Sequence, residues 1–488
     1  MRLLTLVHRW LGITACLLFA MWFASGIVMH FVPFPALNEA ARIGGLAPLD
    51  TSRVLHGPAE AVKASRRADV TRIRLVQRSD GPVYLLSGAS GLAALHADDL
   101  ADAAVRSESL AVAIATDHAR RRGIDATQAA FADLVDFDQW TVAGDFNRHH
   151  QLYRIALNDE PGTELYVSSV TGEVVQGTTR FQRGWNYVGS VAHWIYPAIL
   201  RSRPAAWQAI VWSMSFVAMI AAVAGSLLGL FRVKVARYRL LSPYGSWHWW
   251  HHLLGLLCAT FVLSWIFSGW LSMDSDLLFS TGSLTSEEKT AVAGAPAWET
   301  LPVHEKWPVS TQAREIEWFA FDQKFYRRER TGVAAQLLFP VSGSGETPPS
   351  IEFLGPREVA AFVERFASAC EAPFVVDAND DYAITLRMPN APVYRSVCGD
   401  VWYHIDGADG RILERSDSSR RAYRWLYSAL HTMDVPALTS RPHLRGALIV
   451  TLCGLGFVFS LTGVVIGWRR LRLCASGRGR DESARDPR

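Results

Sequence analysis

The chain has 488 residues, of which 50% are hydrophobic and 19% are charged, and its formal net charge is +3. Four stretches without Asp, Glu, Lys or Arg are each long enough to cross a bilayer as a helix. A purely soluble enzyme, a nucleic-acid-binding protein and a disordered scaffold need no such segments, so the sequence argues against all three classes. The four stretches are 10–38, 204–231, 240–273 and 446–468.

These stretches divide the chain into transmembrane helices, longer domains and short connections. The short loop between the second and third helices holds four basic residues and no acid, and the tail after Trp468 holds seven Arg against three acids. The positive-inside rule therefore places both termini and this loop in the cytoplasm. We predict transmembrane helices in 1–34, 204–231, 240–273 and 446–468, cytoplasmic segments in 232–239 and 469–488, and outer domains in 35–203 and 274–445.

The first outer domain has the pattern of a small α+β unit. Apolar alternation predicts strands before and after a turn at Asp80-Gly81, then a helix, then three further strands that end in a turn. The expected strands are 70–75, 83–86, 139–142, 151–157 and 164–168, the helix is 107–122, and the last turn is 170–173.

The second outer domain repeats this order of elements. We expect strands at 316–321, 325–329, 381–387, 394–397 and 402–405, a helix at 356–369 and a turn at 408–411. Cys370 and Cys398 are the only two of the six cysteines in an outer domain. They form either a disulfide, if the compartment is oxidising, or two buried thiols.

An internal repeat relates the two halves of the chain. The spacing of His8, Leu11 and Gly12 returns at 251–255, and Ser25-Gly26 follows His8 at the same distance as Ser268-Gly269 follows His251. A gapless match joins 172–232 to 410–470. Both copies start in the cytoplasm, so we predict two parallel repeats about an axis along the membrane normal. The expected fold is mainly α in the bilayer, and each repeat carries one α+β domain.

The opening His8-Arg9-Trp10-Leu11-Gly12, the four spans and the Thr171-Gly172-Glu173-Val174 turn resemble the PepSY-associated transmembrane helix family. This family includes iron-regulated bacterial inner-membrane proteins and haem-containing ferric-siderophore reductases of the ferrioxamine-reductase type. The resemblance covers nearly the whole chain. It implies periplasmic PepSY-like domains, a bacterial inner-membrane location, haem b and electron transfer.

Histidines in or at the ends of the spans are the candidate ligands of haem iron, because imidazole is a common axial ligand. The repeat pairs His8 with His251 at the cytoplasmic side and His193 with His431 at the outer side, which predicts two haem b groups. His30 could replace one member of the outer pair, and His248 or His252 could replace His251. Interfacial anchoring without any metal is the alternative role for such histidines.

Two arginines follow the outer histidines at the same distance. Arg203 and Arg441 each lie ten residues after an outer His, where the guanidinium could neutralise a haem propionate or anchor the chain at the membrane surface. We therefore include both among the candidate cofactor-binding residues and assign no catalytic side chain.

The expected function is reduction of a periplasmic ferric siderophore, which releases Fe(II) because hard oxygen donors hold that ion less tightly. The chain has no dinucleotide fingerprint and no P-loop, so electrons are expected from quinol or from a separate reductase. The outer domains have a net negative charge, which is compatible with a neutral or cationic chelate. The alternatives are a PepSY-type peptidase-binding or regulatory membrane protein and a metal transporter.

Overall fold

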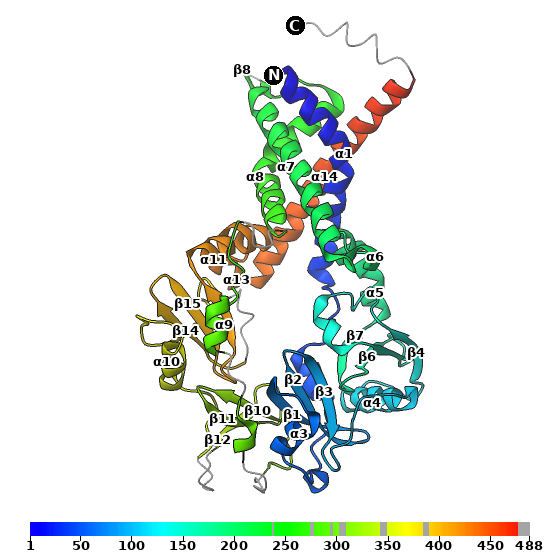
Figure 1. Ribbon diagram of the computed structural model, residues 1–488. Helices are drawn as coiled ribbons and strands as arrows, with labels where there is room; N and C mark the ends of the chain where they lie inside the picture. The colour runs from blue at the N-terminus through cyan, green and yellow to red at the C-terminus, as the bar shows by residue number, and fades with distance from the viewer. Residues whose placement is uncertain are drawn as a thin grey trace. The chain divides into compact units, whose positions relative to one another are not determined.

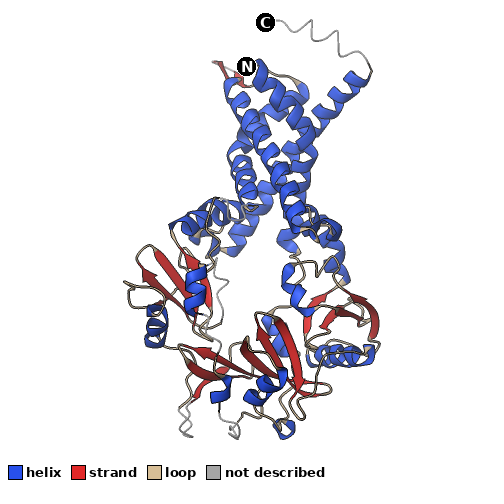
Figure 2. Ribbon diagram, viewed as in Figure 1, coloured by secondary structure: helices blue, strands red, loops and turns tan. Residues whose placement is uncertain are grey.

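The chain folds into two compact units, here called the membrane unit and the sheet unit. The structure is a computed structural model that describes residues 1–236, 239–273, 278–292, 296–301, 309–341, 349–383 and 390–476. The membrane unit comprises Met1–Phe34, Gly184–Phe279 and Ala422–Arg488, and the sheet unit comprises Pro35–Arg183 and Ser280–Arg421. The long helices belong to the first unit and the large sheets to the second (Figures 1 and 2).

Four helices of the membrane unit are long and apolar enough to cross a bilayer, as the sequence predicted. They are α1 (Arg2–Phe31), α7 (Pro204–Phe231), α8 (Ser246–Leu271) and α14 (Pro442–Ala475). Proline begins α7 and α14, where its missing N–H costs no hydrogen bond. Helix α14 extends beyond the predicted end of the span at 468, and Arg472 in its last turn interacts favourably with the helix dipole. Residues 477–488 of the predicted tail lie outside the described residues.

The four helices form a closed ring. Helix α1 contacts α14 and α7, and α8 contacts the same two neighbours, so α1 lies diagonally across from α8 (Figure 1). The small buried residues Ala15, Ala218 and Cys258 let the helices approach closely. Helices related by the sequence repeat are therefore diagonal partners. Strands β8 (Lys234–Ala236) and β9 (Arg239–Leu241) form the short hairpin between α7 and α8.

Two short helical regions also belong to the membrane unit, although the predicted outer domains extended to 203 and 445. Each contains a π-helical segment, at Tyr187–Val191 and Arg424–Ala429. The first is attached to α1, since Asn186 donates from Nδ2 to the Pro33 carbonyl at 3.1 Å. Both segments expose apolar side chains at repeat-equivalent positions, which are Tyr187 and Val188, and Trp425 and Leu426. Exposed apolar residues of this kind are typical of membrane contact.

A six-stranded antiparallel sheet joins the two predicted outer domains within the sheet unit. Its order is β12-β11-β10-β1-β2-β3. Strands β1 (Val70–Arg78), β2 (Gly81–Gly88) and β3 (Gly91–His96) come from the first domain, and β10 (Glu315–Phe321), β11 (Lys324–Arg330) and β12 (Gln336–Val341) from the second. Strand β1 pairs with β10 from Arg72↔Phe319 to Val76↔Glu315. The sequence predicted most of these strands but not their pairing across domains.

Each predicted domain also forms a four-stranded antiparallel sheet covered by one helix. The first contains β4 (Ala130–Val135), β5 (Leu152–Ala156), β6 (Glu164–Ser168) and β7 (Val174–Thr178), with α4 (Glu108–Arg121). The second contains β13 (Phe374–Val375), β14 (Val393–Cys398), β15 (Val401–Asp406) and β16 (Ile412–Ser416), with α10 (Pro356–Glu364). Buried alanines of α4 pack on Ile155 and Leu165, so the helix and sheet share one core.

Two predicted strands differ from the structure. The strand expected at 139–142 is wrong, because these residues form a turn in which the Asp138 carboxylate accepts from the Trp140 amide at 2.8 Å and from the Thr141 hydroxyl at 3.0 Å. Such local side-chain bonds compete with a strand ladder. The strand expected at 381–387 falls partly outside the described residues, and Asp381–Ala383 lies in a turn.

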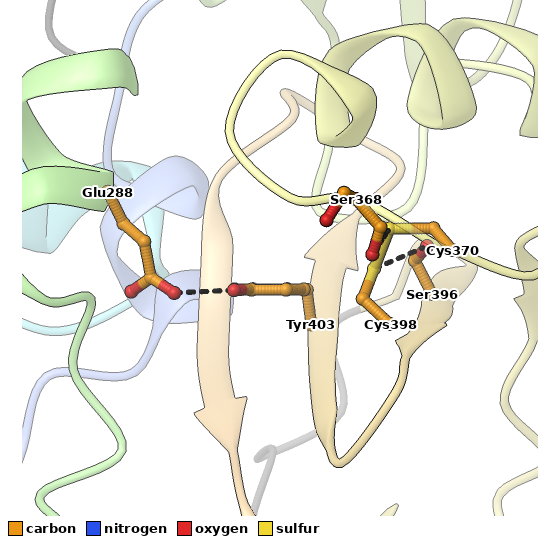
Figure 3. Close-up of a disulfide and its surroundings, with 6 residues drawn as sticks. All are labelled: Glu288, Ser368, Cys370, Ser396, Cys398 and Tyr403. Atoms are coloured by element: carbon orange, nitrogen blue, oxygen red, sulfur yellow. Dashed lines mark hydrogen bonds between the residues drawn. A yellow bond between two sulfur atoms is a disulfide. The ribbon is translucent and has the colours of Figure 1, made fainter.

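Cys370 and Cys398 form a disulfide (Figure 3). It links the end of β14 to the segment after α10, and the two residues are 28 positions apart. On the neighbouring strand β15, the Tyr403 hydroxyl donates to Glu288 at 2.5 Å. Of the two alternatives for this cysteine pair, the structure therefore has the disulfide.

A buried ion network lies at the junction of β1 and β10. Glu315 is fully buried and accepts from Arg42 at 2.7 Å, Arg330 at 3.1 Å and Arg74 at 3.2 Å. Arg74 also binds both carboxylate oxygens of Glu173. Burial alone would raise the pKa of Glu315, but the charges of Arg42 and Arg74 hold it well below its usual range. The network therefore links residues of both predicted outer domains by ion pairs.

Candidate functional site

Two histidines from diagonal helices face each other in the membrane unit. His8 of α1 and His251 of α8, here called the first pair, have ring centroids 6.2 Å apart at an interplanar angle of 35°. His8 Nδ1 lies 3.1 Å from the Ala221 carbonyl on α7. His251 Nδ1 lies 2.8 Å from the Thr462 hydroxyl on α14. All four helices thus position the first pair.

A second pair has nearly the same separation. His193 and His431 follow the two π-helical segments, and their ring centroids are 6.3 Å apart at 63°. His193 Nδ1 lies 3.0 Å from the Ser25 hydroxyl on α1, and His431 Nδ1 lies 3.1 Å from the Ser268 hydroxyl on α8. The repeat-equivalent serines therefore hold the repeat-equivalent histidines.

The hydrogen bonds determine which ring nitrogen of each histidine carries the proton. The hydroxyl protons of Ser25, Ser268 and Thr462 are donated to backbone carbonyls one turn earlier, at 2.6, 2.8 and 2.6 Å. Each hydroxyl has only one proton, so it must accept from histidine Nδ1–H. The Ala221 carbonyl can only accept, so His8 has the same tautomer. All four rings therefore direct Nδ1–H to an oxygen and keep a lone pair on Nε2, as metal-bound histidines do.

The backbone around the second pair is unusual in both copies. Ile195 and Met433 each lie two residues after a histidine of the pair and have φ of +49° and +55°. A β-branched residue such as Ile195 rarely adopts this left-handed conformation. π-Helical segments are also frequent at functional sites. This costly local geometry recurs at equivalent positions, which makes the second pair a candidate functional site.

Glycines lie beside the imidazoles. A Cβ on Gly225 would be 2.5 Å from His8 Cε1, and one on Gly269 would be 3.3 Å from His431 Cε1. The repeat-equivalent glycines are roomier, with Gly463 at 3.5 Å from His251 and Gly26 at 3.9 Å from His193. Glycine therefore lets a neighbouring helix lie directly against each ring.

The donor set fits haem iron bound by two histidines. An imidazole–metal bond is about 2.0–2.1 Å long and the nitrogen lies about 1.1 Å from the ring centre, so two trans imidazoles have centroids about 6.3 Å apart. Both pairs match this separation. Among the described residues, no group of three or more His, Cys, Asp or Glu could hold a metal ion. A two-ligand site suits a macrocycle that supplies the remaining donors.

The other candidate histidines occupy different positions. Both nitrogens of His252 have partners, with Nδ1 at 2.9 Å from Ser242 and Nε2 at 2.9 Å from the Gly229 carbonyl. His248 is exposed. His30 of α1 is also exposed. It lies against the first turns of α14, where a Cβ added to Gly446 would be 2.8 Å from His30 Nε2. The structure thus brings together the repeat-matched histidines.

Arg203 and Arg441 lie directly before α7 and α14, and both are exposed. This position is equally suited to a propionate at the helix end and to a lipid headgroup.

Sequence reasoning did not assign roles to the residues that support the imidazoles. Ser25 and Ser268 were recognised as repeat markers only, and Thr462 was missed because its repeat equivalent is Ala224. The signal for the serines was their fixed distance from His8 and His251. Thr462 has no such signal, since only the packing of α14 against α8 brings it to His251.

The fold defines a protein with four helices able to cross a membrane, and the site consists of two buried histidine pairs within that helical unit. Neither models of protein families nor proteins of curated function give a match to this chain. The functional interpretation therefore rests on the geometry of the site.

Proposed function

We propose that this protein is a bacterial inner-membrane haem b reductase that passes electrons across the membrane to a ferric siderophore in the periplasm. The observation that carries the proposal is the presence of two imidazole pairs whose ring centroids are 6.2 and 6.3 Å apart and whose Nδ1 atoms all have oxygen partners, which leaves each Nε2 available to a metal. When bound, haem would supply a one-electron ferric/ferrous couple at each site.

The protein residues would hold and tune this cofactor. Two histidine ligands leave no open position on iron, which favours outer-sphere electron transfer over oxygen chemistry. The Nδ1–H bonds to Ser25, Ser268, Thr462 and the Ala221 carbonyl fix the ring orientations and make each Nε2 a stronger donor. Arg203 and Arg441 are proposed to bind propionates of the second site.

The two sites lie at different depths along the bundle. Ser25, which holds His193, follows His8 by 17 residues of the same helix, or about 25 Å at 1.5 Å per residue. This distance is most of the roughly 30 Å hydrocarbon thickness of a bilayer. One site would therefore accept electrons near the cytoplasmic face, from quinol or a separate reductase, and the other would deliver them near the periplasmic face.

Reduction would release iron because Fe(II) is held less tightly by the hard oxygen donors of a siderophore. The net negative charge of the predicted outer domains favours a neutral or cationic chelate. The parallel repeat is part of this proposal. It relates His193 to His431 and also relates the two serines that hold them, Ser25 and Ser268.

The test is an absorption spectrum and a pyridine-haemochrome assay of the protein purified in mild detergent from haem-replete cells. We expect sharp reduced α and β bands and about two haems per chain. Substituting Ala for His8 or His251 removes one haem, and substituting Ala for His193 or His431 removes the other. His252→Gln is the matched control and retains both. A colourless wild-type protein would refute the proposal.

Substrate reduction needs a separate assay. The dithionite-reduced, desalted protein is mixed with a ferric trihydroxamate, and haem reoxidation is followed together with Fe(II) capture by a coloured chelator. Reoxidation with stoichiometric Fe(II) supports the assigned substrate class. Reoxidation by oxygen or ferricyanide but not by the trihydroxamate contradicts it.

A further inference from the structure

We infer that Phe459, Phe23 and Trp265 form a packed aromatic path between the two histidine pairs and that this path sets the rate of electron transfer between them. The inference rests on the proposed haem function and assigns a role to residues that bind no metal. Phe261 packs beside the path and completes the cluster.

The path begins at the first pair. The Phe459 ring on α14 is stacked on His251, with centroids 4.9 Å apart and an interplanar angle of 23°. A Cβ on Gly255 of α8 would lie 3.2 Å from the same ring. Phe459 is therefore held between α8 and α14, directly against an imidazole of the first pair.

The middle of the path crosses to α1. Gly456 lies one turn before Phe459, and a Cβ there would be 2.7 Å from the Phe23 ring. Phe23 is only 4% exposed, and its centroid lies 6.0 Å from Trp265 and 6.3 Å from Phe261. Phe261 and Trp265 are 5.6 Å apart. These rings belong to one apolar core cluster of the four-helix bundle.

The path ends at the second pair. Trp265 is one turn before Ser268 on α8, and its carbonyl lies 3.2 Å from the Ser268 hydroxyl. That hydroxyl accepts from His431 Nδ1 at 3.1 Å. The series from His251 to His431 thus consists of packed rings joined by two backbone steps of one helical turn each, from Phe459 to Gly456 on α14 and from Trp265 to Ser268 on α8.

The repeat shows that helix packing alone does not require the three phenylalanine rings. The repeat-equivalent residues of Phe459, Phe261 and Phe23 are Ala221, Leu18 and Ile266, whereas Trp265 matches Trp22. The histidines, serines and glycines of the sites likewise occur in both copies. The phenylalanines that link the first pair to the tryptophan are therefore present in one copy only, as expected for a single connection between two sites.

With haem bound at both pairs, the path would assist the transfer of one electron from the site held by His8 and His251 to the site held by His193 and His431. The first site would be oxidised and the second reduced by one electron, while no bond would form or break and no proton would move. Electron tunnelling falls off less steeply through packed π systems than across a gap, so the rings increase the coupling between the sites. The first site is reduced again by a one-electron donor, for which dithionite serves in the test.

The test uses the full chain in proteoliposomes that enclose ferricyanide, with dithionite added outside. Bleaching of ferricyanide reports electrons that have crossed both sites. Phe23→Leu is expected to lower the rate on the order of tenfold, which corresponds to about 1.4 kcal/mol in the barrier. Haem content and both midpoint potentials, measured by redox titration, are expected to stay unchanged. Phe216→Leu is the matched control, because Phe216 belongs to a separate cluster with Trp212 and Trp270.

A second variant keeps every ring. Gly456→Ala places a methyl group where the Phe23 ring now lies, so the ring must move, and the rate is again expected to fall. Unchanged rates in Phe23→Leu and Gly456→Ala would overturn the inference, as would an equal loss in Phe216→Leu. The proposed function fails differently, since a wild-type protein without haem would conduct no electrons at all.

Discussion

The substitution Gly225→Ala should selectively disturb the first histidine pair. A Cβ on Gly225 would lie 2.5 Å from His8 Cε1 and 2.8 Å from Nδ1, whereas a Cβ on the repeat-equivalent Gly463 would lie 3.5 Å from His251 Cε1. The second value is an ordinary van der Waals contact. His8 must therefore move by about 1 Å to accept a methyl group that His251 accepts without movement.

A displacement of this size matters because a trans pair of ligands has little tolerance in its separation. The ring-centroid distances within the two pairs differ by only 0.1 Å. Both distances fit two imidazoles that bind one metal ion from opposite sides. Movement of His8 also strains its bond to the Ala221 carbonyl, and loss of such a supporting bond typically costs about 10–100-fold in metal affinity. Gly→Ala in a helix otherwise stabilises it by up to about 1 kcal/mol, so lower stability of the fold is not the expected cause.

The assay compares Gly225→Ala with Gly463→Ala, which makes the same chemical change at the equivalent position. Gly225→Ala is expected to retain about one haem, at the second pair, and Gly463→Ala about two. Pyridine-haemochrome quantitation and low-temperature EPR of low-spin ferric haem measure the outcome. Two unperturbed haems in Gly225→Ala, or equal loss in both variants, would refute the geometric reasoning.

Three further outcomes are expected. Thr462→Val leaves His251 Nδ1–H without its acceptor, so redox titration should show a higher midpoint potential at the first pair and no change at the second. Glu315→Gln removes the buried carboxylate that Arg42, Arg74 and Arg330 share, and thermal unfolding should report a loss of about 3–5 kcal/mol. An unchanged melting temperature would contradict this value. Burial, with the charges of Arg122 and Arg42, lowers the pKa of His118 to about 4, so His118 is neutral when folded. The free energy of unfolding therefore has its full value above about pH 6.5 and falls by about 3 kcal/mol as the pH drops to about 4, because the unfolded chain binds the proton more readily. His118→Leu should flatten this part of the profile of melting temperature against pH.

The membrane helices were predictable because each is a property of a contiguous stretch. A long run of apolar residues without charge favours a helix that can cross a bilayer, and the structure has such helices at all four predicted positions. Most strands were predictable for a similar reason, as with β6 at Glu164–Ser168, where local alternation sets the pattern. The turn at Asp138 was not, because side-chain bonds within three residues overrode the strand signal.

The sheet unit shows a different limit. The strands β1 and β10 are more than 230 residues apart, and nothing in either strand specifies the other as its neighbour. The paired strands share a hydrophobic core, with Ile73 and Ile316 among its members, and the ion network around Glu315, whose partners come from three separate segments. Long-range contacts of this kind arise only when the whole unit is assembled.

By itself, the sequence determined four apolar spans and an internal repeat, and from the repeat it named the four histidines that the structure places in two pairs. It left open whether His30, His248 or His252 took part, because hydropathy and spacing do not specify which side of a helix faces the bundle. The tertiary structure decided that point by rotating His251 toward His8 and His252 toward Gly229. It also decided the Nδ1 partners and the aromatic path, since each joins residues on different helices that only close packing brings together.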